Sequence, residues 1–180
     1  MARGLVLGRN VTIPASAYID TNYPYLIRIG NNCSFGNDVR LIAHDATPFK
    51  FTGGYTRLGR IEIKDNCFIG EKTIVLPGAT IGPNVLVAAG SLVNRDIPPN
   101  SCVAGIPARF YARFDDLIER HLQQIGERPV YEYSNLASGK DEVLRRQIWQ
   151  AVQDGDAYVK GYVGEYPYTL NKEPREAKRQ

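Results

Sequence analysis

Residues 63–98 read IKDNCF IGEKTI VLPGAT IGPNVL VAAGSL VNRDIP, a run written in units of six. Each unit opens with an aliphatic residue, and four places later stands a small or β-branched one, of which the last, Ile97, is large for its place. Helices need apolar residues every three to four positions and half-buried strands every two, so a period of six fits neither. It indicates a solenoid of short strands joined by tight turns. The units open at Ile63, Ile69, Val75, Ile81, Val87 and Val93.

The same frame extends toward the N-terminus and slips twice. A short insert lies near residues 23–28 and a long one near residues 46–62. Each slip follows a third unit, so we expect three units to make one turn of a triangular coil. Both inserts then leave from the same corner, one coil apart. The earlier units open at Leu7, Ile13, Ile19, Ile29, Phe35 and Leu41.

The cysteines fall into the places for small inward residues. The frame stacks Cys33 under Cys67 in neighbouring coils, one strand spacing of about 4.8 Å apart. A redox or metal pair is one interpretation. We favour the other, in which both are small buried hydrophobes. Cys102 stands in no motif and receives no role.

The six-residue frame ends after GIPAR at residues 105–109. We therefore expect a coil domain over residues 1–109 and an extension over residues 110–180. In the extension, Asp115 is the expected N-cap of a helix through Gln124 that Gly126 ends and that caps the open coil. A second helix is expected from about Lys140 to Gln153.

A tyrosine-rich run follows, broken by glycine and proline, which favours an extended arm or loop over a helix. Its aromatic rings either stack on sugar faces or pack on a neighbouring subunit, and we favour packing. The final residues, KEPREAKRQ, are interpreted as a solvated tail. The tyrosines are Tyr158, Tyr162, Tyr166 and Tyr168.

Composition narrows the class of protein. The chain has 180 residues and a formal net charge of +3, too small to indicate nucleic-acid binding. The first residues, MARGLVLGRN, are too short and too glycine-broken for a signal peptide, and no apolar run is long enough to span a bilayer. We expect a cytoplasmic protein with free thiols.

Several motifs resemble those of one enzyme family. IGNNCSFGNDVRLIAHD, a long insert, IEIKDNCFIGEKTIVLPGATIG, VAAGSLVNRDIPPN and AGIPAR are similar to hexapeptide-repeat acyltransferases, nearest to the galactoside, maltose and virginiamycin acetyltransferase type and to polysaccharide O-acetyltransferases. The resemblance covers about residues 7–113. It implies a mainly β fold, a left-handed parallel β-helix with a helical C-terminal extension. It also implies a homotrimer that binds acetyl-CoA between subunits and acetylates a sugar or polysaccharide hydroxyl.

A hydroxyl acceptor needs a base as it attacks a thioester, and histidine has a pKa near working pH. His44 is the only histidine of the coil, and it stands where the family places its catalytic one. The resemblance therefore implies that His44 is the general base of a direct ternary-complex transfer. Acceptor contacts are expected from Asp45, which is equally well a turn residue, from Asp20 at the analogous corner, and from Phe49 and Tyr55 in the insert.

The resemblance also implies where the cofactor binds. Small residues Ala88 and Ala89 match the segment that lines the pantetheine arm, and Asn94 and Arg95 match positions farther along it. Arg109 and Arg113 lie near the expected nucleotide phosphates, where forked guanidinium donors fit phosphate oxygens. We expect no metal site.

Other readings stay open. A zinc hydratase of this fold needs three histidine ligands, and the coil has one. N-acetylation of an amino sugar is the main enzymatic alternative, and a solenoid that only scaffolds partners is the non-enzymatic one. The sequence names neither the acceptor nor its hydroxyl.

Overall fold

The computed structural model describes residues 4–133, 141–153 and 155–161. It consists of two compact units, Met1–Leu117 and Ile118–Gln180, which are treated separately. The first unit extends past the expected boundary at residue 109, because β15 (Arg109–Arg113) still pairs with β14 (Ser101–Ala104). Tyr162, Tyr166, Tyr168 and the tail lie outside the described residues.

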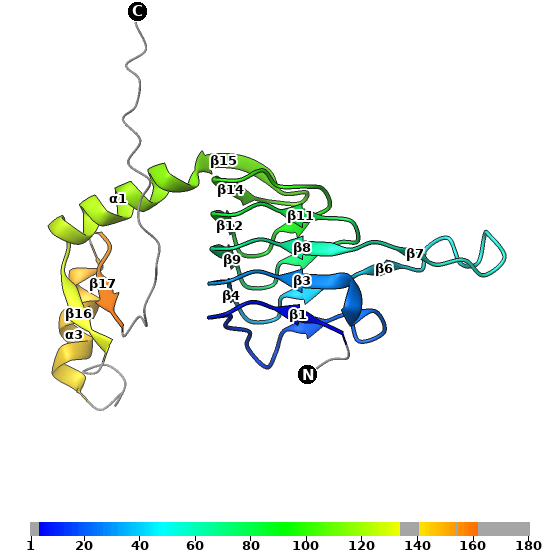
Figure 1. Ribbon diagram of the computed structural model, residues 1–180. Coiled ribbons are helices and arrows are strands. Elements are labelled where there is room, and N and C mark those ends of the chain that lie inside the picture. The colour runs from blue at the N-terminus through cyan, green and yellow to red at the C-terminus, as the bar shows by residue number, and fades with distance from the viewer. Residues whose placement is uncertain (1–3, 134–140, 154, 162–180) are drawn as a thin grey trace, which may run out of the picture. The chain divides into compact units, whose positions relative to one another are not determined.

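The first unit is a coil with three parallel sheets, one for each unit of six in a turn (Figure 1). Strands from successive coils stack in parallel register, for example Ile63 beside Ile29 and Ile81 beside Ile63. The predicted period of three strands per turn is confirmed. Face A holds β1 (Val6–Leu7), β3 (Ile27–Ile29), β8 (Ile61–Ile63) and β11 (Thr80–Ile81); face B holds β4 (Ser34–Phe35), β9 (Cys67–Ile69), β12 (Val85–Val87), β14 and β15; face C holds β2 (Tyr18–Ile19), β5 (Arg40–Leu41), β10 (Ile74–Val75) and β13 (Leu92–Val93).

The core is a narrow column of the residues that open the units. Ile63, Ile69, Val75, Ile81 and Val87 are almost completely buried. Each buried aliphatic side chain of this size contributes about 1.5–3 kcal/mol relative to an exposed one. The predicted stacking of Cys33 below Cys67 is confirmed, because the residues that directly follow them, Ser34 and Phe68, are paired in neighbouring coils. Both cysteines are buried and both thiols are free.

One corner of the coil is built from asparagines. Asn10, Asn32, Asn66 and Asn84 all have φ near +55°, a left-handed conformation that asparagine tolerates better than most residues. Their amides form a ladder in which each Nδ2 donates to the Oδ1 of the next, over 3.0–3.1 Å. The turn formers in the repeat therefore serve both to bend the chain and to join the coils.

The last coil is shorter than the frame predicts. Ile97 bridges to Ile81 and so occupies a large inward position of face A, not the small one in which the frame places it. The turn from Val93 to Ile97 has lost two residues, and the carboxylate of Asp96 accepts the Thr80 N–H at 2.7 Å. The large side chain of Ile97 thus fits, because the shortened turn moves it to a position that takes a large residue.

The first helix differs from the prediction at both ends. α1 runs Phe114–Glu127, so Asp115 lies in the first turn and Gly126 lies inside the helix. Phe114 is buried and its N–H donates to the Asn100 carbonyl, and the helix starts two residues earlier than an N-cap at Asp115 would place it. Gly126 has no positive φ, so it does not act as the terminating residue.

The second unit contains α3 (Glu142–Ala151) and a parallel pair, β16 (Val130–Glu132) with β17 (Tyr158–Lys160). Asp141 is the N-cap of α3 and accepts the Leu144 N–H at 2.9 Å. The Tyr158 hydroxyl donates to Gln124 at 2.8 Å and lies 3.0 Å from Nδ1 of His121. The first tyrosine of the expected arm is therefore in a strand and is held by α1.

Candidate active site

Both inserts leave the coil at the corner between faces C and A, as the frame predicts. The short insert contains the 3-10 turn η1 (Pro24–Leu26). The long insert begins with β6 (His44–Asp45), which pairs antiparallel with β7 (Arg57–Leu58), and this hairpin projects away from the coil (Figure 1). The insert therefore lies about two residues earlier than the expected range 46–62, because it begins with β6 and Ile61–Ile63 already forms β8.

His44 is bound to Asp20 at this corner. The distance from Nδ1 of His44 to Oδ2 of Asp20 is 2.5 Å. The Asp20 side chain is completely buried, whereas that of His44 is 25% exposed. A neutral imidazole that donates its Nδ1–H to the carboxylate keeps Nε2 as an acceptor. The pair therefore holds one ring nitrogen ready to accept a proton.

The carboxylate of Asp20 is held by backbone donors as well. Its Oδ2 accepts the Ala43 N–H at 2.9 Å, and its Oδ1 accepts the N–H groups of Asn22 and Tyr23 at 3.1 and 3.2 Å. Burial raises the pKa of Asp20, but the hydrogen bonds from His44 and these amides bring it below its ordinary value. A buried carboxylate with this many donors stays ionised and fixes the histidine.

Two tyrosines from the short insert lie beside His44. The Tyr23 ring is 5.3 Å from the imidazole, centroid to centroid, and Tyr25 meets Tyr23 edge to face at 6.3 Å. The sequence interpretation did not include either tyrosine among the site residues. The sequence does contain a signal for them, because both lie in the short insert, which leaves the coil at the same corner as the His44 insert and one coil earlier.

Asp45 faces the base of the long insert. Its Oδ1 accepts both the N–H and the hydroxyl of Thr47, at 2.9 and 2.6 Å, and its Oδ2 lies 3.9 Å from Nε of Arg57. The hydrogen bonds from Thr47 lower the pKa of Asp45. In this structure the carboxylate closes the turn at the start of the insert.

The tip of the insert presents aromatic rings to solvent. Phe49 and Tyr55 are 51% and 73% exposed, and Phe51 between them is 88% exposed. Gly53 and Gly54 have φ of +78° and +101°, which side chains other than glycine rarely adopt, and Gly54 lies against the Phe49 ring. The rings are thus displayed by a turn that depends on its glycines.

The residues matched to the pantetheine arm lie at two corners. Ala88 and Ala89 follow β12 at the corner between faces B and C, and the Ala88 carbonyl accepts the hydroxyls of Ser91 at 2.6 Å and Thr73 at 3.2 Å. Asn94 and Arg95 are exposed and follow β13, at the corner that carries His44 two coils away. One chain therefore does not bring all of them together with His44.

The matched arginines lie on β15, beyond the regular coil. Arg109 and Arg113 are both exposed, and Nη2 of Arg113 is 3.9 Å from the Asp115 carboxylate. β15 returns antiparallel along β14 after a turn that contains the cis bond Ile106–Pro107. The AGIPAR motif therefore forms the hairpin that presents these guanidinium groups.

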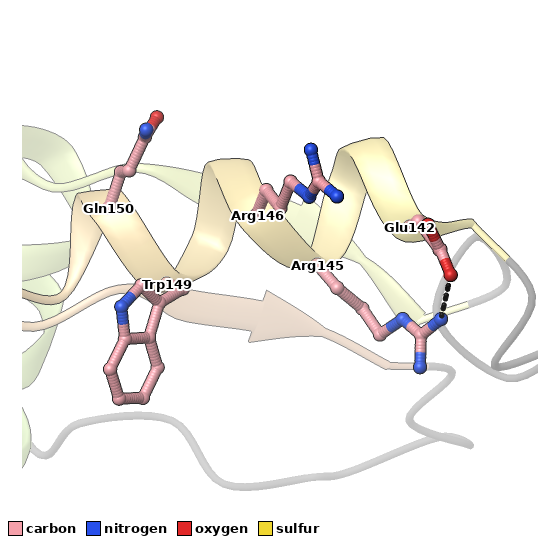
Figure 2. Close-up of a pocket in the computed structure, with 5 residues that line it drawn as sticks. All are labelled: Glu142, Arg145, Arg146, Trp149 and Gln150. Atoms are coloured by element: carbon pink, nitrogen blue, oxygen red, sulfur yellow. Dashed lines mark ion pairs between the residues drawn. The ribbon is translucent and has the colours of Figure 1, made fainter.

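The second unit has a hollow of about 510 Å³ along α3 (Figure 2). Trp149 and the two arginines point from the helix, and Glu142 pairs with Arg145 at 4.0 Å. Among the described residues, no group of three or more His, Cys, Asp and Glu is arranged to hold a metal ion, and no helix is both long and apolar enough to cross a bilayer. The hollow is lined by Glu142, Arg145, Arg146, Trp149 and Gln150.

Part of the coil matches a known family model. Residues 60–95 match the family described as bacterial transferase hexapeptide (six repeats). The galactoside O-acetyltransferase of Escherichia coli K12 is 33% identical over 115 residues, which cover 61% of this chain and 57% of that protein. The chain is related to the hexapeptide-repeat acetyltransferases. It spans 52% to 63% of the length of the first curated relatives that it matches.

Solved structures of acetyltransferases share the hexapeptide coil. A maltose O-acetyltransferase from Clostridium difficile 630 is 28% identical, with a TM-score of 0.50 over 61% of this chain and 69% of that one. A galactoside acetyltransferase in complex with coenzyme A is 26% identical, with a TM-score of 0.51 over 63% of this chain and 67% of that one. These acetyltransferases are therefore similar to this chain over about three fifths of its length.

Proposed function

We propose that the protein is an acetyl-CoA-dependent O-acetyltransferase that acts on a hydroxyl of a sugar or polysaccharide. One observation carries the proposal: His44 is oriented by the buried carboxylate of Asp20 at the corner where the insert leaves the coil. The relatives named for galactoside and maltose O-acetylation support the class of acceptor, and a solved relative that holds coenzyme A supports the acyl donor.

In the proposed reaction His44 is the general base. Its Nε2 takes the proton of the acceptor hydroxyl as that oxygen attacks the thioester carbonyl carbon. The tetrahedral species then expels the thiolate of coenzyme A, which takes the proton back from the imidazolium, and the acetyl ester leaves. Asp20 stabilises the imidazolium while it exists, because a fixed carboxylate lies against Nδ1.

We assign Asp20 as a positioning residue in place of the expected acceptor contact, because its side chain is completely buried. Acceptor contact is proposed for the exposed rings of Phe49 and Tyr55, since loops on a rigid scaffold commonly carry specificity. Asp45 is half-buried and engaged by Thr47, so an acceptor that binds it must share its oxygens with that turn.

Coenzyme A is proposed to bind along Ala88, Ala89, Asn94 and Arg95, with Arg109 and Arg113 toward its phosphates. The side chains at the first two positions are small, which lets an extended chain approach the backbone. Because Ala88 and Ala89 lie at a different corner of the coil from His44, the proposed site joins two copies of the chain. A homotrimer would provide such a shared site. We also propose that the coil is left-handed and that the protein is cytoplasmic.

A transfer assay tests the function. The protein is incubated with acetyl-CoA and a panel of sugars and oligosaccharides, and free thiol is measured. We expect thiol release with at least one hydroxyl acceptor, and an alkali-labile ester as the product. An alkali-stable amide would show N-acetylation instead. No turnover together with no binding of coenzyme A would contradict the proposal and favour a scaffold.

A further inference from the structure

A small cleft opens on the outer surface of face A, next to the His44 corner. Its space is about 190 Å³, and it is lined by Tyr25 and Leu26 from η1, Arg28 from β3, and Arg60 and Glu62 at β8. All of these residues belong to the first unit. The proposed acetyl transfer at His44 does not use this cleft.

Positive charge predominates around the cleft. Arg28 and Arg60 line it, and Lys64 lies at its edge, against the single carboxylate of Glu62. Glu62 is shared, because Oε1 is 3.4 Å from Arg60 and Oε2 is 2.5 Å from Lys64. The hydrogen bond from Lys64, and then the nearby arginines, lower the pKa of Glu62, so this one negative charge persists. Three cations against one anion leave the cleft with an excess of two positive charges.

A row of rings joins the cleft to the proposed base. Tyr25 lines the cleft and meets Tyr23, and Tyr23 in turn lies against the His44 imidazole. Tyr25 is 55% exposed, which leaves its ring accessible for stacking on the apolar face of a sugar. The rings of Tyr25 and Tyr23 therefore connect the cleft to His44, with centroid separations of 6.3 and 5.3 Å along the row. One or two sugar residues can span a separation of this size.

We propose that the cleft binds an anionic group of the acceptor, a carboxylate or a phosphate, and thereby selects acidic sugars. Arg28 and Arg60 bind the anion, since guanidinium forks match the paired oxygens of either group. Tyr25 supports the sugar ring, and Glu62 accepts a sugar hydroxyl. This inference rests on the proposed function, because it describes the acceptor of the reaction at His44.

The test compares acceptors that differ in charge and share ring hydroxyls. Methyl galactoside is the neutral probe, carboxymethyl galactoside carries a carboxylate, and galactose 1-phosphate and galactose 6-phosphate carry a phosphate. We expect kcat/KM to be higher for a charged probe than for methyl galactoside. The better charged probe shows whether carboxylate or phosphate is preferred.

The variants Arg28→Gln and Arg60→Gln should each reduce the charged-to-neutral ratio of kcat/KM by about tenfold or more, the effect of losing a hydrogen bond to a charged group. Arg9→Gln removes an exposed guanidinium elsewhere on the coil and should not change the ratio. Equal use of charged and neutral probes would overturn the inference while leaving the proposed function intact. If Arg28→Gln or Arg60→Gln raised the KM for acetyl-CoA and left the charged-to-neutral ratio unaltered, the cleft would belong to the cofactor and the inference would also be overturned. No acetyl transfer to any acceptor would overturn both.

Discussion

The residues of the site come together because two corners of the coil are stacked. Asp20 directly follows β2, and His44 lies just after β5 of the next coil; β2 and β5 are paired, one strand spacing apart. The backbone amides around Asp20 fix its carboxylate before any substrate is present. A histidine at this place is therefore preorganised by the fold.

The Asp20→Asn variant tests the orientation of His44. An amide presents a donor or a weaker acceptor to Nδ1, so the imidazole loses its fixed tautomer. We expect kcat to fall at least tenfold while the KM for acetyl-CoA stays unchanged, because a misoriented imidazole slows the chemical step and not the binding of the cofactor. Asp65→Asn is the matched control, since Asp65 also accepts a backbone N–H, from Asn31, at another corner. A wild-type kcat in Asp20→Asn would contradict the assignment.

Asp20 also predicts an acid dependence of stability. Its pKa is lower in the folded chain than the ordinary value of about 3.9. The folded state therefore binds fewer protons than the unfolded state in this range, and stability falls as the pH drops below about 4 through the folded-state pKa. Urea unfolding at pH 7, 5, 4 and 3 should show a smaller acid loss in Asp20→Asn than in the wild type. If the free energy of unfolding fell equally with pH in both proteins, the Asp20 carboxylate would not contribute to the acid dependence of stability.

At the scale of elements, the repeat predicted much of the coil. The six-residue spacing placed the strands on three faces and located both inserts, because each inward position admits only a side chain of a given size. It did not predict the two-residue loss before Ile97. There the Asp96 carboxylate accepts the Thr80 N–H, and such a side-chain hydrogen bond leaves no mark on the six-residue period. It also missed the tilt of Tyr23 onto His44, which depends on the conformation of η1 and not on a pattern.

The asparagine ladder allows two contributions to stability to be separated. Asn66 has φ of +57° and its amide bonds to Asn32 and Asn84. We expect Asn66→Ala to lower the free energy of unfolding by about 1–3 kcal/mol, because it loses both the ladder and a tolerant backbone. Asn66→Gly keeps the left-handed conformation and should cost less. If the two variants unfold at the same urea concentration, the backbone conformation contributes nothing.

At the scale of the whole molecule, the proposed cofactor residues Ala88 and Ala89 lie at a different corner of the chain from the proposed base, whereas Asn94 and Arg95 share its corner. Ala89 follows face B, whereas His44 follows face C. A site shared between copies is an expectation from the resemblance alone, because contacts between copies leave no period in a single chain. A site shared by two copies has a consequence that can be measured by mixing inactive variants.

Co-expression of His44→Ala with Ala89→Trp tests the shared site. Each variant alone should be inactive, the first without its base and the second because an indole fills the path of the cofactor. In a cyclic assembly of random composition, about a quarter of the sites combine an intact histidine with an intact alanine, so about a quarter of wild-type activity should return. No recovery would place the whole site within one chain.

The central claim, that His44 is the base of acetyl transfer, is tested most directly by the His44→Ala variant. Its kcat with the best hydroxyl acceptor should fall by roughly 10²–10⁴-fold, the usual contribution of a positioned base, while coenzyme A still binds. His121→Ala, which removes the histidine of α1, is the control and should keep wild-type turnover. Near-normal turnover of a folded His44→Ala protein would contradict the account.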